Sequence, residues 1–213
     1  LTSVILPDTL TVIHESAFQN CTALAYVGFG SGLKTIYRSA FRGCTALSEV
    51  SLSNGVTYLE HWVFADCPAL TSVSLPDTLA SLGYQIFLND TALTKINIPV
   101  GWNNCPSYSY GAFTGYSHLF ENCTSLTSIT IPEGLVVLPA HALDGCAQLQ
   151  NVYLPSTLTT IGVSALNRCT ALAGITFPEK LETISESAFL GCTSFTSLHF
   201  PASLRTIYNF AFD

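Results

Sequence analysis

Charged residues are scarce in this chain of 213 residues. Aspartate, glutamate, lysine and arginine make up 10% of the sequence, and the formal net charge at pH 7 is −7. Nucleic-acid binding needs a basic surface, and electrostatic attachment to anionic lipid needs clustered lysine and arginine. Only seven lysine and arginine residues are present, so we expect neither kind of partner.

Long apolar runs are also missing, although 48% of the residues are hydrophobic. No run reaches the roughly 18 residues that a membrane-spanning helix needs, so this segment is not expected to insert into a membrane. No signal peptide is visible at the N-terminus. The hydrophobic content is instead sufficient for a sizeable buried core.

The motifs of common catalytic and metal sites are absent as well. The sequence has no glycine-rich phosphate loop, no H-E-x-x-H and no G-x-S-x-G. Its eight cysteines include no C-x-x-C pair, and its histidines are not clustered as zinc ligands would be. We therefore expect no cofactor, no metal and no enzymatic activity. Cys105 and His118 would suit a nucleophile and its base by residue type, but nothing in the sequence sets their distance.

What the sequence does contain is a repeat. Cysteine recurs every 23 residues in two runs, at Cys21, Cys44 and Cys67 and again at Cys123, Cys146, Cys169 and Cys192. A fixed period in this range is typical of a solenoid, in which each unit packs only against its neighbours. We expect one solenoid over residues 1–213, with about nine units of 23 residues and an insertion at about 100–116.

Each unit repeats one apolar frame. Counted from the cysteine, apolar residues fall at +3, +6, +8, +12, +15, +19 and +20, and proline usually falls at +9. The segment from +5 to +8, such as 72–75, alternates polar and apolar residues, which predicts a short strand with one buried face. Proline has no N–H group and ends the strand at a turn. A pair such as Ala40-Phe41 predicts one buried turn of α- or 3₁₀-helix.

The residue immediately before each recurring cysteine, and before Asp90 in the unit without that cysteine, is predicted to have left-handed backbone. Seven of its eight residues are Gly, Asn or Asp, the types that tolerate positive φ, and Arg168 is the exception. Asn20, Asn89 and Asn122 at this position begin N-x-[ST] sequons. The repeat itself produces these sequons, so they carry no firm evidence of glycosylation.

This frame resembles the BspA-like leucine-rich repeat of bacterial and protozoan surface proteins. The matching motif is C-x-x-L-x-x-[VI]-x-[LIF]-P-x-x-L-x-x-[IL]-x-x-x-A-[FL]-x-x-C, and it covers nearly the whole chain. The resemblance implies a right-handed coil with a parallel sheet of short strands on one face and turns, short 3₁₀ or helical segments on the other. Commoner leucine-rich repeats carry an asparagine ladder after the strand, where this chain has Thr or Gly.

The recurring cysteines are expected to form a structural ladder of free thiols. Equivalent positions in neighbouring coils lie one strand spacing apart, roughly 4.8 Å, with parallel Cβ directions. A disulfide needs Cβ atoms ~3.8 Å apart, so the thiols should pack as small hydrophobes. Asp90 takes the place of the cysteine in one unit. It is either a local cap for backbone N–H groups of the disturbed coil or a functional carboxylate.

The period slips once. From Asp90 to Cys123 the chain runs 33 residues, ten more than one unit, and the excess lies within 100–116. Insertions in a solenoid map to loops on one face, often the binding face. This one combines aromatic residues with Gly, Ser and Asn, as adaptable recognition loops do. We predict binding through Trp102, Tyr108, Tyr110, Tyr116 and the adjacent His118; alternatively the rings fill the gap left by missing frame residues.

Two further surfaces follow from the frame. Positions +5 and +7 should point outward from the strands and form a polar, nearly uncharged open face that includes Tyr26 and Tyr153. These side chains are either solvated strand residues or a docking surface for an extended protein partner. Positions +16 to +18 form a second edge rich in rings, namely His14, Tyr37, His61, Trp62, Tyr84, His141, Tyr208 and Phe210.

We therefore expect a non-catalytic binding module of a cell-surface or secreted protein. The family resemblance implies adhesion to host extracellular matrix or plasma proteins, or to other cells. The alternatives are a structural stalk, or a glycan-binding accessory segment of a larger enzyme. Leu1 and Asp213 both fall inside a unit without a polar cap, so we expect a longer protein that carries its targeting signal elsewhere.

Overall fold

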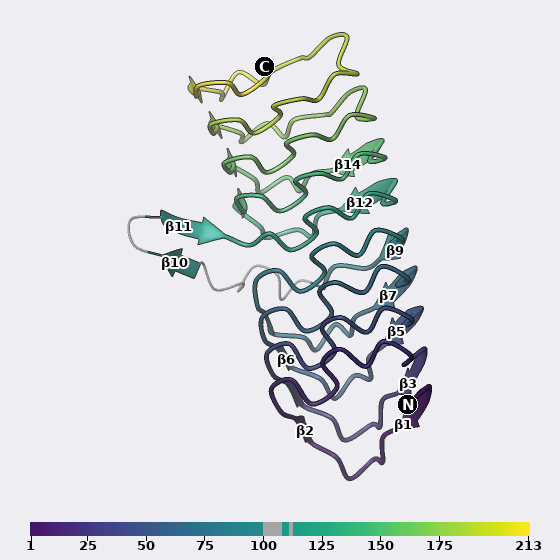
Figure 1. Cartoon of the computed structure of the whole chain (residues 1–213). Coiled ribbons are helices and arrows are strands. Elements are labelled where there is room, and N and C mark those ends of the chain that lie inside the picture. Colours follow the sequence, from purple (N-terminus) through teal and green to yellow (C-terminus); the bar gives the residue numbers. More distant parts are fainter. Residues whose placement is uncertain (100–107, 111–112) are drawn as a thin grey trace.

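The chain winds into a stack of coils whose short strands form two parallel rows (Figure 1). The structure is a computed structural model and describes residues 1–99, 108–110 and 113–213. Equivalent residues of consecutive coils pair 23 positions apart, as in Ser3 with Tyr26 and Glu49 with Ser72. The predicted solenoid of parallel strands is confirmed.

The first row, here called the open-face row, holds the strands predicted at positions +5 to +7. They alternate as expected, because the middle residue is buried in strands such as Glu49–Ser51 while its two neighbours are exposed. The strands are β1 (Ser3–Ile5), β3 (Tyr26–Gly28), β5 (Glu49–Ser51), β7 (Ser72–Ser74), β9 (Lys95–Ile96), β12 (Ser128–Thr130) and β14 (Asn151–Tyr153).

The second row, here called the turn-side row, was not predicted. Each of its strands has two residues, too few for an alternating pattern to stand out in the sequence. Its strands are β2 (Val12–Ile13), β4 (Thr35–Ile36), β6 (Tyr58–Leu59), β8 (Ser81–Leu82), β13 (Val137–Leu138), β15 (Thr160–Ile161), β16 (Thr183–Ile184) and β17 (Thr206–Ile207).

The core between the rows contains a column of stacked phenylalanine rings. Phe41 and Phe64 lie 5.6 Å apart between ring centroids and 15° from parallel, and Phe64 and Phe87 lie 5.9 Å apart. All three side chains are fully buried. Burying such a side chain contributes roughly 1.5–3 kcal/mol, so the column is a main source of stability. The predicted burial of the Ala-Phe pair is confirmed at Ala40 and Phe41.

The segments around this pair are turns. The structure has no helix within the ranges it describes, so the predicted turn of α- or 3₁₀-helix is replaced by hydrogen-bonded turns. The N–H groups of Phe18 and Asn20 donate to the carbonyls of Ala40 and Arg42 in the next coil. Donors that bond to the next coil cannot also close a helix, and the bonds between coils prevail.

Positive φ is found at the position before the cysteine, as predicted, and Arg168 is no exception. Its φ is +58°, close to the +60° of Asp66 and the +61° of Asn122. The exception predicted for Arg168 was therefore wrong. The N–H of Arg168 donates to the Leu190 carbonyl at 2.7 Å, and this bond between coils outweighs the local preference of arginine.

A second left-handed position, at +18, was missed. Its φ values lie between +43° and +58° in every unit, although none of these residues is glycine. The rotation lets the N–H of Ser16, Ser39 and Trp62 donate to carbonyls of the following coil. The residues at this position are Ser16, Ser39, Trp62, Gln85, His118, His141, Ser164, Ser187 and Phe210.

The open-face row is interrupted. β1 pairs only with β3, β5 to β9 form a second sheet, and β12 pairs only with β14. Segments 174–176 and 197–199, predicted as strands, are not strands in the structure. The turn-side row continues through this region as β13, β15, β16 and β17, so the last coils are joined on one side only.

Gly145 offers a test of the left-handed turns. Its φ is +77°, and a Cβ atom there would lie 2.3 Å from Oδ1 of Asn122. We expect Gly145→Ala to lower the free energy of unfolding by about 1–3 kcal/mol, measured by chemical or thermal denaturation. Gly174→Ala is the matched control, because a Cβ at Gly174 meets nothing within 4 Å. Equal stability of the two variants would contradict this account.

Candidate functional site

Part of the insertion forms an antiparallel hairpin that projects from the turn side of the solenoid (Figure 1). Strand β10 (Tyr108–Tyr110) pairs with β11 (Phe113–Tyr116), with Tyr108 opposite Tyr116 and Tyr110 opposite Phe113. Three of the predicted binding residues, Tyr108, Tyr110 and Tyr116, thus lie on one hairpin. Trp102 and Cys105 lie outside the described residues.

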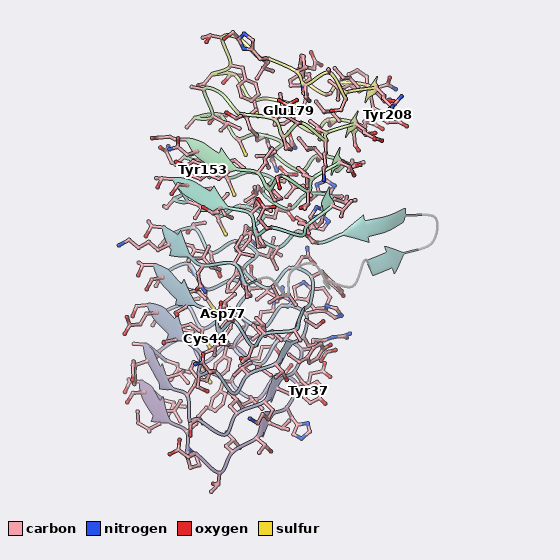
Figure 2. The ribbon with its side chains drawn as sticks, turned by 180° about the vertical axis from the view of Figure 1, so that it is seen from behind. Tyr37, Cys44, Asp77, Tyr153, Glu179 and Tyr208 are labelled. Carbon is pink, nitrogen blue, oxygen red and sulfur yellow. The ribbon has the colours of Figure 1, made fainter. Side chains whose placement is uncertain are left out.

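The other two predicted tyrosines lie elsewhere. Tyr26 and Tyr153 are on the open-face row, with 46% and 59% of their surface exposed. Figure 2 shows Tyr153 on one side of the solenoid, and the hairpin on the other, together with Tyr37 and Tyr208. The predicted binding residues therefore form two separate groups.

The open face itself has the predicted character. Side chains at +5 and +7, such as Ser51, Ser74 and Thr130, are exposed. The only two charged residues at these positions are Glu49 and Lys95, both exposed. The face is a polar surface with little charge to steer a partner.

The ring-rich edge is partly occupied by contacts among its own rings. The rings of His14 and Tyr37 stack with centroids 5.6 Å apart, and those of His61 and Tyr84 stack at 3.8 Å. Trp62 meets Tyr84 edge to face, and the Arg38 guanidinium lies 5.6 Å from its ring centroid. Sugar binding by stacking needs a free ring face, so these contacts weigh against the glycan-binding alternative at this edge.

His118 lies at the base of the hairpin, two residues after β11. Its ring stacks on that of His141, with centroids 4.4 Å apart and planes 6° from parallel. Nδ1 of His118 lies 2.6 Å from Oε2 of Glu121, and Nδ1 of His141 lies 3.0 Å from Oδ2 of Asp144. Sequence reasoning missed the two carboxylates, although a His-x-x-acid pattern recurs 23 residues apart and was available as a signal.

Asp144 is the anchor of this cluster. Burial of its carboxyl group favours the neutral form, but hydrogen bonds from His141 and Arg168 outweigh burial and hold its pKa below the usual value. Nη2 of Arg168 lies 2.9 Å from Oδ1 of Asp144. The carboxylate therefore stays charged and ties together the two coils that follow the hairpin in the chain.

The ladder cysteines are free thiols, and all but Cys21 are buried. The seven are Cys21, Cys44, Cys67, Cys123, Cys146, Cys169 and Cys192. From Cys44 onward each thiol donates to a carbonyl of the preceding coil, as Cys67 does to Phe41 at 3.3 Å. Burial raises the pKa of Cys44 to about 11 and that of Cys146 to about 12. Such thiols are poor nucleophiles at neutral pH.

The repeat, its two strand rows and its thiol ladder point to one family. A model of the BspA type leucine-rich repeat region matches residues 1–116 and 116–213. The chain belongs to this family. The predicted resemblance is thereby confirmed.

Solved structures agree with this assignment. A leucine-rich repeat protein from Bacteroides ovatus is 29% identical, with a TM-score of 0.74 over 97% of this chain. The T. pallidum leucine-rich repeat protein TpLRR is 27% identical, with a TM-score of 0.67 over 80% of this chain and 78% of its own. A leucine-rich cell surface protein from Faecalibacterium prausnitzii is 27% identical, with a TM-score of 0.53 over the whole of this chain and 70% of its own.

The likeness does not reach to function. The chain spans 56% of the length of the Bacteroides ovatus protein, and no curated protein matches it. The residues that the structure describes include no group of three or more His, Cys, Asp or Glu side chains placed to hold a metal ion. Within the same residues, no helix has the length and apolar character of a membrane span.

Asp90 is the one member of the BspA-type ladder that is not a cysteine. Its side chain is fully buried, and its Oδ1 accepts the N–H of Cys67 at 2.8 Å. Oδ2 has no partner among the described residues. Burial therefore raises the pKa of Asp90 well above its usual value, despite the bond from Cys67. This geometry favours a local cap over a functional carboxylate, but the N–H that is capped belongs to Cys67 of the preceding regular coil and not to the disturbed coil.

The raised pKa makes stability depend on pH. The pKa of Asp90 is about 3.9 in the unfolded chain and higher in the folded chain. Between these two values the native state holds more protons, so its stability falls as pH rises. We expect the melting-temperature gain of Asp90→Cys over the parent to grow from pH 4 to pH 8.

The control is Asp77→Asn, which removes an exposed carboxylate of the same half of the solenoid. Its melting temperature should follow that of the parent across the same pH range. Parallel curves for Asp90→Cys and the parent would show that Asp90 is ionised to the same extent folded and unfolded, and would contradict the neutral buried carboxyl.

Proposed function

We propose that this chain is a non-catalytic, protein-binding segment of a cell-surface or secreted protein. Its family membership and its likeness to the Faecalibacterium prausnitzii cell surface protein support this location. The buried, protonated thiols and the absence of a catalytic motif in the sequence support a role in binding. The partners we propose are host extracellular matrix or plasma proteins, or proteins of other cells.

The observation that carries this proposal is the hairpin. It is the largest departure from a uniform coil, and it projects from the body of the solenoid rather than following its surface (Figure 1). Its sequence is rich in tyrosine, with glycine and serine between the rings. Tyrosine gives a large contact area with only two side-chain torsions to fix, so such loops bind proteins at low entropic cost.

The base of the hairpin is built to hold its position. The N–H groups of Gln85 and Phe87 donate to the carbonyls of Ser117 and Leu119, across the insertion. The stacked rings of His118 and His141, each with its own carboxylate, lie beside these bonds. A loop that leaves a fixed base loses less freedom on binding than one that leaves a mobile base.

The test is binding to a panel of immobilised extracellular matrix and plasma proteins. The triple variant Trp102→Ala, Tyr108→Ala, Tyr110→Ala should bind at least about 30-fold more weakly, since hot-spot aromatics contribute about 2 kcal/mol or more. The control is Tyr26→Ala with Tyr153→Ala, which removes the exposed rings of the opposite side and should leave binding unchanged.

Two results would contradict the proposal. Binding that is lost in the control pair but kept in the triple variant would move the site to the open face. A parent chain that binds none of the panel would favour the structural stalk, in which the solenoid only spaces other modules.

A further inference from the structure

Strand β14 has an open edge inside the solenoid. At paired junctions the N–H at +8 donates to a carbonyl of the next coil, as Leu6 does to Gly28 and Ile131 to Tyr153. The equivalent donor of β14 is Leu154, and its expected acceptor is Thr176. This bond is absent, and the described residues supply no other hydrogen-bond partner to the backbone of Val152 or Leu154.

The opening is confined to one side. On the turn side the same two coils remain joined, because β15 pairs with β16 and the N–H of Leu166 donates to the Ala188 carbonyl at 2.8 Å. On the open side, residues 173–177 make no backbone hydrogen bond to the neighbouring described coils. The gap is therefore a wedge with its closed end at the turn side.

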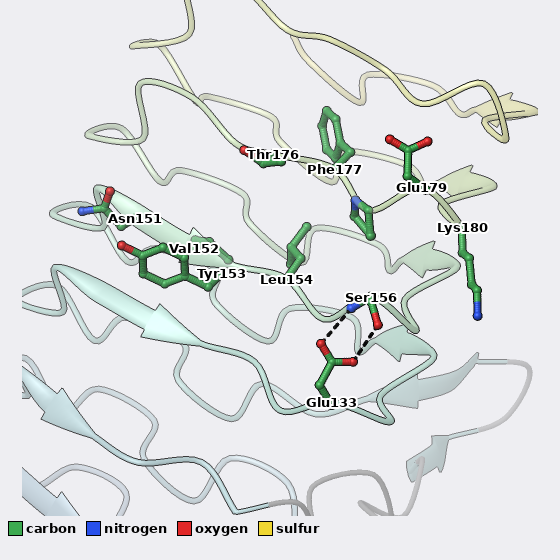
Figure 3. Close-up of a pocket in the computed structure, with 11 residues that line it drawn as sticks. Glu133, Asn151, Val152, Tyr153, Leu154, Ser156, Thr176, Phe177, Glu179 and Lys180 are labelled. Atoms are coloured by element: carbon green, nitrogen blue, oxygen red, sulfur yellow. Dashed lines mark hydrogen bonds between the residues drawn. The ribbon is translucent and has the colours of Figure 1, made fainter.

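The wedge contains a groove of about 640 Å³, within the range of roughly 300–1,000 Å³ typical of binding sites. Val152, Leu154 and Phe177 supply its apolar lining, and the exposed ring of Tyr153 stands at its rim (Figure 3). A second groove, of about 480 Å³, lies between residues 174–177 and the following coil at residues 197–201.

Two carboxylates, Glu133 and Glu179, and Lys180 also line the groove. Glu133 is already engaged, because its two oxygens accept the N–H and the hydroxyl of Ser156 at 3.0 Å each. Glu179 is exposed, and its carboxylate points away from Lys180 (Figure 3). No described cation forms an ion pair with Glu179. This carboxylate is placed to meet a lysine or arginine that enters the groove.

We propose that the β14 edge is a docking site for an extended peptide of another protein, which adds a parallel strand to the sheet. The peptide would use its own N–H and C=O groups to satisfy those of Val152 and the N–H of Leu154. It would alternate polar and apolar residues, as the strands of this solenoid do, and carry one basic residue for Glu179. The site is separate from the hairpin and does not rest on the function proposed above.

The probe is a blocked hexapeptide with the sequence of residues 93–98, Leu-Thr-Lys-Ile-Asn-Ile. This segment contains β9, which pairs in parallel with β7 in the solenoid, and it has the required pattern and one lysine. Titration into the ¹⁵N-labelled chain should shift the amide signals of Val152, Leu154 and Thr176 in NMR spectra. The chain with Trp102, Tyr108 and Tyr110 replaced by Ala should respond equally.

Two matched controls separate strand pairing from simple apolar contact. The same peptide with alternate backbone N-methyl groups cannot donate along one edge, and should bind at least 10-fold more weakly. Glu179→Lys changes only an exposed side chain. It should weaken binding of the parent peptide and strengthen binding of a peptide with Glu in place of Lys.

The proposal is overturned if the N-methylated peptide binds as well as the parent peptide, or if the shifts fall on other parts of the chain. It is also overturned if the parent peptide causes no shift and the β14 amides instead respond to dilution of the chain alone. That outcome would assign the edge to a second copy of this chain.

Discussion

The structure depends on backbone hydrogen bonds that run from each coil to the next along the turn side. These bonds dictate conformations that the local sequence does not favour, including left-handed backbone at Trp62 and Arg168. Each is worth only about 0.5–1.5 kcal/mol net, but a coil donates several of them and loses them together if it shifts. The coils are therefore held in register on this side even where the open-face row has no pairing, as between β14 and residues 174–176.

The fold was predictable because the same pattern of buried residues recurs in every unit. A single Cys44 or Phe41 says little, whereas the same residue types at a constant spacing identify one buried column. The second left-handed position escaped prediction for a physical reason. The positive φ at this position serves a backbone N–H, which every residue except proline has. The residue types there therefore carry no signal of the left-handed conformation.

The candidate sites were predictable only in part. The ten extra residues between Asp90 and Cys123 located the insertion, but not its hairpin, because that pairing is local and unrelated to the frame. Tyr153 and the hairpin are separated because they lie on opposite sides of the coil. The spacing of residues in the sequence does not reveal on which side of a coil an insertion projects. The open edge of β14 left no clear mark in the sequence either. Phe177 stands at +8, and Phe29 stands at the same position in a coil that does pair with β1.

The phenylalanine column passes the insertion without a change in spacing. Phe87 and Phe120 are 33 positions apart in the chain, yet their rings stack at 5.6 Å and 3° from parallel, as rings 23 positions apart do elsewhere. The spacing of the core rings thus depends on the stacking of one coil on the next and not on the number of residues between the rings in the sequence. In such an array the residues of the phenylalanine column are constrained in every unit. A loop inserted elsewhere in the unit is free to vary, provided that the chain returns to the same backbone hydrogen bonds. New binding specificities can then arise by exchange of a short segment, with the scaffold kept as it is.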